Sequence, residues 1–209
     1  MKKISVIMPC TLAEYPGAAK DRKRKLERAV DSFLHQDYPE KELIVVSDGC
    51  QATVELMHSR FSYREGVHVH KIQAQPRFSG APRNEGIRLA TGEVICYLDS
   101  DDFLIPDHLH VISKVNWYEA DWCYYDDMVR LNDGRYAKRV TEPAYSRIGT
   151  SSIAHKRSLK VVWPNGYGHD WRMIQSCLLG KRCAKAGDGG YVVCHAEVVI
   201  GKKVHKVDN

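Results

Sequence analysis

The chain has 209 residues, of which 44% are hydrophobic and 27% charged, and its formal net charge is +5. These values suit a soluble globular protein with a buried core, and no apolar stretch approaches the roughly 18 residues of a membrane span. The seven cysteines lack CxxC spacing, which argues against a zinc knuckle and favours free thiols in a reducing cytoplasm.

The first half of the chain is predicted to alternate apolar strands with helices. The expected strands cover residues 4–9, 42–49, 66–73 and 93–99. The first expected helix opens with the basic segment 20–28 and ends near Gln36, and two more cover residues 52–60 and 81–92. Such alternation indicates an α/β fold, with a mostly parallel sheet covered by helices on both faces.

Polar residues follow three of these strands, at residues 9–11, 47–49 and 99–102. In parallel sheets, ligands bind at the carboxyl ends of the strands. We therefore expect these three segments to share one crevice.

The second half of the chain is less regular. A hairpin is expected from segments 122–131 and 134–142, which flank the turn at residues 132–134. A helix near 171–179 and a terminal strand over 191–200 complete the prediction.

The basic segment 20–28 contains six basic and two acidic residues. Its helix has an apolar stripe that should face the core, namely Leu26, Ala29, Val30, Phe33 and Leu34. The simple interpretation of the other faces is that water solvates them. The alternative is peripheral contact with an anionic membrane or with nucleic acid.

Three carboxylates, Asp99, Asp101 and Asp102, crowd together after the fourth strand. Residues i and i+2 of an extended segment point the same way, so Asp99 and Asp101 could face one site, with Asp102 turned aside. Carboxylate oxygens are natural ligands of Mg²⁺ or Mn²⁺, which usually bridge to substrate phosphates. Capping of the next helix is the alternative, but it would explain one aspartate more easily than three.

Several segments resemble family-2 glycosyltransferases in order and spacing. They are ISVIMP, RAVDSFLHQDYP, ELIVVSDG, APRNEGIRLATGEVICYLDSDDFLIPDHL and GHDW. The resemblance covers most of residues 3–110 and returns more weakly near 149–200. It implies a GT-A fold with a Rossmann-like central sheet, in a single catalytic domain over 1–209. Residues 1–110 would then bind the nucleotide sugar and 111–209 the acceptor.

The resemblance also implies a nucleotide-diphosphate sugar as donor, expected to be a UDP-sugar, and Mn²⁺ or Mg²⁺ as cofactor. Pro9 and Thr11 should line the nucleotide pocket, and Asp48 should accept a hydrogen bond from the base. Many family members have Asp-Asp where this chain has Ser47-Asp48, which leaves the base less certain.

The resemblance places further donor-site residues beside the diphosphate and the metal. Arg83 and Asn84 should lie beside the diphosphate and the acidic motif, although a surface arginine and a capping asparagine are the structural alternatives. Within the motif Asp99-Ser100-Asp101, Asp99 should contact the ribose or the metal's surroundings, and Asp101 should bind the metal.

The resemblance places the catalytic base at Asp170, which would take the proton of the acceptor hydroxyl. His169 stands where the family usually has glutamate, and it is expected on the acceptor side with Ser151 and Trp171. Asp170 could also cap the helix that follows. His195 could complete the metal site, although a lone histidine on a strand is more often structural.

These features predict a metal-dependent inverting transferase that acts on a saccharide or lipid-linked saccharide. It is expected to be cytoplasmic, or peripheral at the inner membrane surface. A modified base in nucleic acid is the alternative acceptor. A nucleotidyltransferase is disfavoured because no glycine-rich basic loop follows the first strand. A non-catalytic nucleotide-binding module also stays open, because Ser47 and His169 depart from the family pattern.

Overall fold

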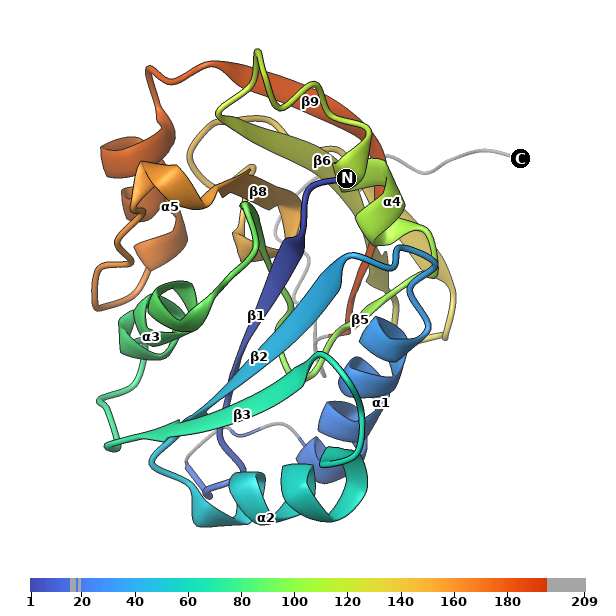
Figure 1. Ribbon diagram of the computed structural model, residues 1–209, viewed down its shortest axis with the longest axis vertical. Helices are drawn as coiled ribbons and strands as arrows, with labels where there is room; N and C mark the ends of the chain where they lie inside the picture. The colour runs from blue at the N-terminus through green and yellow to red at the C-terminus, as the bar shows by residue number, and fades with distance from the viewer. Residues whose placement is uncertain (16–17, 19, 195–209) are drawn as a thin grey trace.

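The computed structural model describes residues 1–15, 18 and 20–194. Its first half forms the predicted parallel sheet, in the order β3-β2-β1-β4 (Figure 1). These strands are β1 (Ile4–Cys10), β2 (Lys41–Asp48), β3 (Val67–Ile72) and β4 (Val94–Tyr97). Their carboxyl ends lie at one edge of the sheet, as the sequence predicted.

Helices cover both faces of this parallel part. Helices α1 (Arg22–Leu34) and α2 (Gln51–Phe61) lie on one face, and α3 (Ala81–Leu89) lies on the other (Figure 1). The predicted stripe of α1 is confirmed, since Leu26, Ala29, Val30 and Phe33 are buried in the core and Leu34 packs against it. Helix α3 approaches β1 so closely that a Cβ at Gly86 would lie 2.3 Å from Cγ2 of Ile7.

The second half adds strands of mixed direction to the same sheet. They are β5 (Phe103–Leu104), β6 (Trp122–Arg130), β7 (Tyr136–Arg139), β8 (Ile153–Lys156) and β9 (Cys183–Val193). Strand β8 is antiparallel to both β4 and β6, whereas β9 is parallel to β6. The predicted hairpin is confirmed, because β6 and β7 pair as antiparallel neighbours. This is the arrangement that a short turn between two strands allows. The sheet is thus parallel in its first half and mixed in its second.

The remaining helical segments are short. They are α4 (His108–Ser113), α5 (His169–Met173), the π-helical turn η3 (Ile174–Leu178) and the 3-10 turns η1 (Thr150–Ser152) and η2 (Arg157–Leu159). Helix α5 begins at His169, so Asp170 lies in its first turn and not at the N-cap position that one interpretation expected.

The predicted boundaries of the last strand were wrong. The observed strand β9 starts at Cys183, and residues 195–200 of the predicted strand lie outside the described residues. The glycines at positions 187, 189 and 190 are typical of a loop, and the sequence therefore gave no sign of a strand there. One of them is needed by packing, because a Cβ at Gly189 would lie 2.1 Å from the Tyr125 ring.

Candidate active site

A cleft of about 580 Å³ lies at the carboxyl ends of β1, β2 and β4. Eight of the residues singled out from the sequence line it, namely Pro9, Thr11, Asp48, Arg83, Asp99, Ser100, Asp101 and His169. They come from three strand ends, from helix α3 and from helix α5. The expectation that the strand ends share one crevice is therefore met in the structure.

Arg83 is the central cation of this cleft. Its Nη2 lies 2.7 Å from Oδ1 of Asp99, and its guanidinium lies 4.9 Å from the centre of the Trp163 ring. The residue is only 8% exposed, and its buried Nε has no hydrogen-bond partner within the described part of the chain. Arg83 is thus held rigidly by the acidic motif and by Trp163, with donor capacity left for a bound anion.

The three clustered aspartates have different surroundings. Asp99 and Asp101 line the cleft, whereas Asp102 is 1% exposed and lies behind it. Oδ2 of Asp102 accepts a hydrogen bond from the Tyr191 hydroxyl at 2.8 Å, and Oδ1 accepts one from the Cys194 amide at 2.7 Å. Burial, together with the nearby charges of Asp101 and Asp99, raises the pKa of Asp102. Asp102 therefore connects the motif to β9 and is turned away from any ligand, as predicted.

Asp48 forms the other end of the cleft. Its Oδ1 accepts a hydrogen bond of 2.8 Å from the backbone amide of Gln75. Burial raises the pKa of Asp48, although this hydrogen bond opposes the rise. Its neighbour Ser47 is fully buried and donates its hydroxyl to the Cys50 carbonyl at 2.7 Å, so it does not line the cleft.

His169 and Asp170 lie next to each other at the start of α5. The His169 ring packs edge-on against Trp163, with 5.5 Å between ring centres, and its Nδ1 lies 3.3 Å from the Phe78 carbonyl oxygen. Burial, reinforced by the positive charge of Arg83, lowers the pKa of His169. The neutral imidazole is therefore the favoured form in this cleft.

The Asp170 carboxylate is held by its own helix turn. Its Oδ1 accepts a hydrogen bond of 2.8 Å from the Trp171 amide. A Cβ at Gly149 would lie 3.5 Å from its Oδ2, so the glycine leaves space beside that oxygen. Asp170 does not line the cleft itself, but it directly follows His169, which does.

Two predicted residues lie elsewhere. Asn84 was expected beside the diphosphate, but its amide donates to the Trp163 carbonyl at 2.9 Å and its Oδ1 accepts from the Trp163 amide at 2.7 Å. Ser151 was expected on the acceptor side, but it is buried and donates to Oδ2 of Asp127 at 2.7 Å. Both polar groups are hydrogen-bonded within the protein and neither residue lines the cleft, so their expected binding roles stay predictions.

The remaining predicted residues are Trp171 and His195. Trp171 packs against the hydrophobic core, and its ring centre lies 6.2 Å from that of the exposed Tyr145, near Asp170. His195 lies outside the described residues.

The sequence did not predict a cleft role for the basic segment 20–28. Arg22 lines the cleft and donates to the carbonyl oxygens of Thr11, Leu12 and Ala13 at 2.8–3.2 Å. Arg28 donates to the Asp101 carbonyl and lies 5.1 Å from the centre of the Phe103 ring. Their amphipathic positions gave no signal of this, because the Arg22 contacts depend on how residues 11–13 fold back toward α1 and the Arg28 contact comes from a segment distant in sequence.

The loop at residues 74–79 was also missed, although it forms one wall of the cleft. Arg77 lies over the rings of Phe78 and Tyr15, at 4.7 and 5.8 Å from their centres. The sequence does contain a hint of this wall: Pro76, Arg77 and Phe78 follow one another between a strand and a helix.

The cleft offers oxygen ligands from two carboxylates, Asp99 and Asp101. Among the described residues, no group of three or more His, Cys, Asp or Glu side chains could hold a metal ion. Two carboxylates still fit Mg²⁺ or Mn²⁺, because these ions commonly take one or two protein carboxylates and complete their coordination with water and substrate phosphates. Both carboxylates face the cleft, and Asp99 also pairs with Arg83.

None of the helices that the structure describes has the length and apolar character needed to cross a bilayer.

Several known proteins are similar to this chain. YibD, an uncharacterized glycosyltransferase of Escherichia coli, is 26% identical over 182 residues, which are 80% of this chain and 49% of the relative. The poly(ribitol-phosphate) beta-N-acetylglucosaminyltransferase TarP of Staphylococcus aureus is 31% identical over 109 residues, which are 50% of this chain and 30% of the relative. The chain thus spans about half or less of the length of these relatives.

Solved structures share the fold. S. aureus TarS 1–349 in complex with UDP-GlcNAc superposes with a TM-score of 0.70 at 17% identity, covering 93% of this chain and 59% of TarS 1–349. The mannosyltransferase PcManGT of Pyrobaculum calidifontis, in complex with GDP-Man and Mn²⁺, gives a TM-score of 0.67 at 18% identity, covering 96% of this chain and 58% of the other. The predicted GT-A fold is therefore confirmed.

The model of one protein family matches residues 5–164, which include β1, β2, β4, helix α3 and the acidic motif of the cleft. This match covers most of the chain and agrees with both the relatives and the fold. The protein therefore belongs to glycosyl transferase family 2.

Proposed function

We propose that the protein is a metal-dependent inverting glycosyltransferase. It moves a sugar from a UDP-sugar to a hydroxyl of a saccharide or lipid-linked saccharide acceptor, with residues 1–110 binding the donor and 111–209 the acceptor. The observation that carries this proposal is the cleft in which Arg83, Asp99 and Asp101 meet Pro9, Thr11 and Asp48 at the carboxyl ends of the parallel strands.

Each end of the cleft suits one part of the donor. Asp48 would accept a hydrogen bond from the base, and the guanidinium of Arg83, which lines the cleft, would donate to the diphosphate. A UDP-sugar is favoured because TarS was solved with UDP-GlcNAc. The GDP-Man complex of PcManGT makes a GDP-sugar the alternative.

Asp101, helped by Asp99, would hold Mn²⁺ or Mg²⁺. A divalent cation bound there supplies Lewis-acid stabilisation of the negative charge on the leaving nucleoside diphosphate. Arg83 contributes to the same neutralisation from the protein side, and Asp99 keeps it oriented through the 2.7 Å ion pair.

Asp170 would act as the general base. Its carboxylate accepts the proton of the acceptor hydroxyl while the hydroxyl oxygen attacks the anomeric carbon from the side opposite the leaving group. The hydrogen bond from the Trp171 amide fixes Oδ1 at 2.8 Å, so Oδ2 is the oxygen that meets the acceptor. His169, neutral in this environment, would shape the cleft and take no part in proton transfer.

Thermal unfolding tests the donor site. We expect one of UDP, GDP, CDP and dTDP to raise the unfolding midpoint with Mn²⁺ but not with EDTA, because a ligand that binds only the native state stabilises it by mass action. Asp101→Ala should abolish the shift. If no nucleotide shifts the midpoint under any condition, the cleft is not a donor site.

A further inference from the structure

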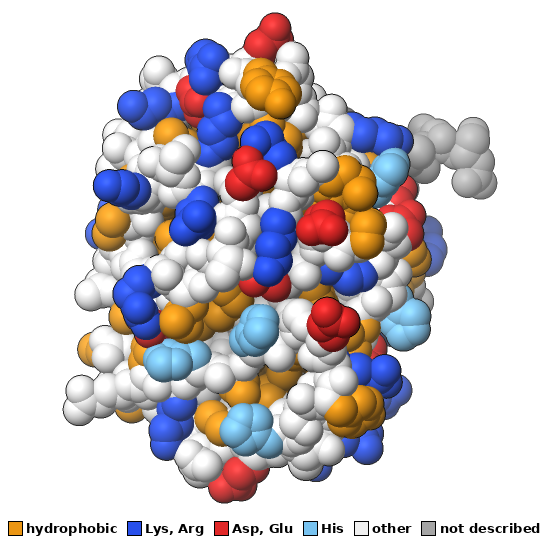
Figure 2. Space-filling model, viewed as in Figure 1, with side chains coloured by type: hydrophobic (Ala, Val, Ile, Leu, Met, Phe, Trp, Pro, Cys, Tyr) orange, Lys and Arg blue, Asp and Glu red, His pale blue; other side chains and the backbone are white. Residues whose placement is uncertain are grey.

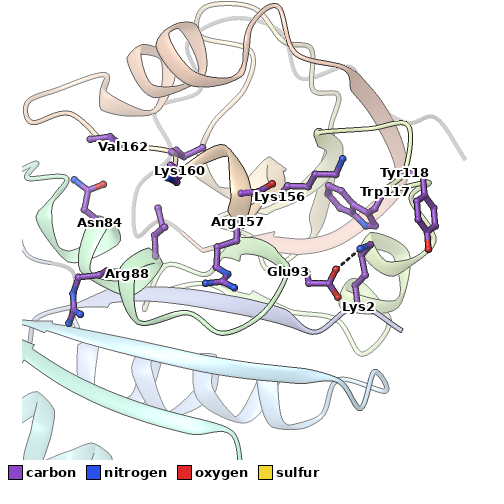
Figure 3. Close-up of a pocket in the computed structure, with 13 residues that line it drawn as sticks. Lys2, Asn84, Arg88, Glu93, Trp117, Tyr118, Lys156, Arg157, Lys160 and Val162 are labelled. Carbon is purple, nitrogen blue, oxygen red and sulfur yellow. Dashed lines mark hydrogen bonds and ion pairs between the residues drawn. The ribbon is translucent and has the colours of Figure 1, made fainter.

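A second concave site lies away from the donor cleft. It is a groove of about 970 Å³ between α3 and segment 156–162, and it extends to Lys2 and Glu93, which precede β1 and β4 (Figure 3). The two sites are separated at the start of α3, where Arg83 lines the cleft and Asn84 lines the groove. None of the residues given an individual role in the proposed reaction lines this groove.

The groove is strongly basic. Five of its lining residues are cations, namely Lys2, Arg88, Lys156, Arg157 and Lys160. Its lining contains one acid, Glu93, which lies 2.5 Å from the Lys2 ammonium. On the face shown in Figure 2, basic side chains lie among hydrophobic and acidic ones in the region of α3, α5 and the amino terminus. The net charge of the groove therefore favours an anionic ligand.

Of these five cations, Arg157 and Lys160 are available for such a ligand, because the other three are already paired with acids. Arg88 pairs with Glu85 and points away from the groove, and Lys156 pairs with Asp121 at 3.0 Å (Figure 3). Arg157 and Lys160 have no side-chain hydrogen bond or ion pair with any described residue, and both are exposed. They stand on one short segment, so one anionic group could engage both.

The backbone of this segment is preformed. The Arg157 amide donates to the Glu93 carbonyl at 2.9 Å, and the Lys160 amide donates to the Arg157 carbonyl at 3.1 Å. Lys160 adopts a left-handed conformation with φ of 50°, which glycine would adopt at lower cost. The chain thus holds a lysine side chain at a position where backbone geometry alone would favour glycine.

The groove also has an apolar side. Ile87, Trp117 and Val161 line it, and two apolar residues at its rim are largely exposed, Val162 at 61% and Tyr118 at 86%. An inorganic anion would leave this apolar surface in water. Nucleic acid would need a series of exposed rings for stacking, whereas Tyr118 is the one exposed ring among the groove residues. Exposed Tyr and Val beside Lys and Arg match the surfaces that bind the interface of anionic membranes.

We propose that this groove binds the phosphate headgroup of an acidic lipid, with Arg157 and Lys160 on the phosphate and the apolar residues against the adjoining acyl region. The site would position the protein at a membrane surface independently of helix α1, whose Arg22 and Arg28 are engaged at the donor cleft.

Calorimetric titration with dihexanoyl phosphatidic acid, a soluble lipid with one phosphate, tests this proposal. We expect it to bind at least about tenfold more tightly than inorganic phosphate, because the acyl region adds apolar burial. The double variant Arg157→Gln/Lys160→Gln should weaken its binding by at least about tenfold, and Val162→Ser should weaken it by a smaller factor.

The matched control is Lys23→Gln/Arg24→Gln, which removes the same charge from exposed positions of α1. The control variant should bind phosphatidic acid with a dissociation constant within about twofold of that of the unsubstituted protein, because only long-range electrostatic interactions change. Co-sedimentation with vesicles of equal parts phosphatidylcholine and phosphatidylglycerol should likewise be lost in the groove variant and kept in the control.

Three outcomes would overturn the proposal: inorganic phosphate that binds as tightly as the lipid, equal losses in both double variants, or a groove variant that binds lipid and vesicles like the original. The UDP-induced shift of the unfolding midpoint, measured on the same variants, should not change. This shift reports on the donor cleft alone, so a failure of the proposed reaction and a failure of the lipid site are distinguishable.

Discussion

At the scale of single residues, neighbours in sequence have unrelated tasks. Asp101 lines the cleft, whereas Asp102 is buried against Tyr191 and the Cys194 amide. The same contrast separates Arg83, which faces the donor site, from Asn84, which fastens α3 to Trp163. In each pair, backbone direction decides which side chain meets a ligand and which supports the fold.

Substitution of the two aspartates should separate these tasks. Asp101→Asn should remove most of the metal-dependent stabilisation by UDP, because it removes a carboxylate ligand. Asp102→Asn should lower the free energy of unfolding by about 1–3 kcal/mol, because an amide nitrogen replaces one of the two oxygens that accept hydrogen bonds from Tyr191 and Cys194. Urea unfolding of both variants, with and without UDP and Mn²⁺, measures the two effects. The reverse pattern would contradict the assignment of Asp101.

Asp170→Asn should remove transfer and leave nucleotide binding intact. Loss of a general base commonly costs about 10²–10⁴-fold in rate, and Asn can still accept the hydrogen bond from the Trp171 amide. A transfer assay and the UDP-induced thermal shift, both on this variant, check the two halves of the prediction. Unchanged turnover would mean that another group takes the acceptor proton.

At the scale of elements, one buried carboxylate connects the parallel strands. Glu42 of β2 accepts hydrogen bonds from the Ser5 hydroxyl of β1 at 2.5 Å and from the Thr91 amide and hydroxyl at 2.7 Å, and it pairs with Lys3 at 2.8 Å. Burial alone would raise the pKa of Glu42, but the hydrogen bonds from Lys3, Ser5 and Thr91 lower it from 4.5 to about 2. The ionised form therefore holds β1, β2 and the start of β4 together.

Glu42→Gln should lower the free energy of unfolding by about 1–3 kcal/mol near neutral pH, because buried donors lose a charged acceptor. The folded pKa lies below the ordinary value, so the contribution of Glu42 is present above pH 4.5 and is lost as the pH falls toward about 2. Urea unfolding across this range should show the difference between the two proteins shrinking. A difference independent of pH would show that packing, and not charge, is responsible.

At the scale of the whole molecule, the donor cleft occupies the carboxyl ends of the parallel strands and the basic groove reaches their amino ends. The cleft and the groove meet at the start of α3, and the sheet is parallel where the cleft is built and mixed beyond β4. The two sites can therefore act on different molecules.

Removal of the metal should affect only one of these sites. With UDP and Mn²⁺ at about 100 times the dissociation constant, the native state gains about 2.7 kcal/mol. For a chain of this size, that corresponds to a rise of about 5–11 °C in the unfolding midpoint. EDTA should abolish the rise and leave lipid binding in the groove unchanged. Loss of lipid binding with EDTA would couple the two sites.

The sequence by itself determined the parallel half of the fold and the position of the candidate cleft at its carboxyl edge. Short continuous apolar runs such as Leu43–Val46, bounded by turn residues, are typical of buried parallel strands, and polar residues that follow such strands are expected at one edge of the sheet. Local patterns carry this information because strands and helices have fixed side-chain periods.

The tertiary structure alone decided the rest. It turned Asn84 and Ser151 into internal hydrogen-bond partners, brought Arg28 against the Asp101 carbonyl, and started β9 at Cys183 despite its glycines. It also gathered Lys2, Glu93, Trp117 and Arg157, which lie far apart in the chain, around one groove. Each of these outcomes depends on contacts between distant segments, and local periodicity carries no information about such contacts.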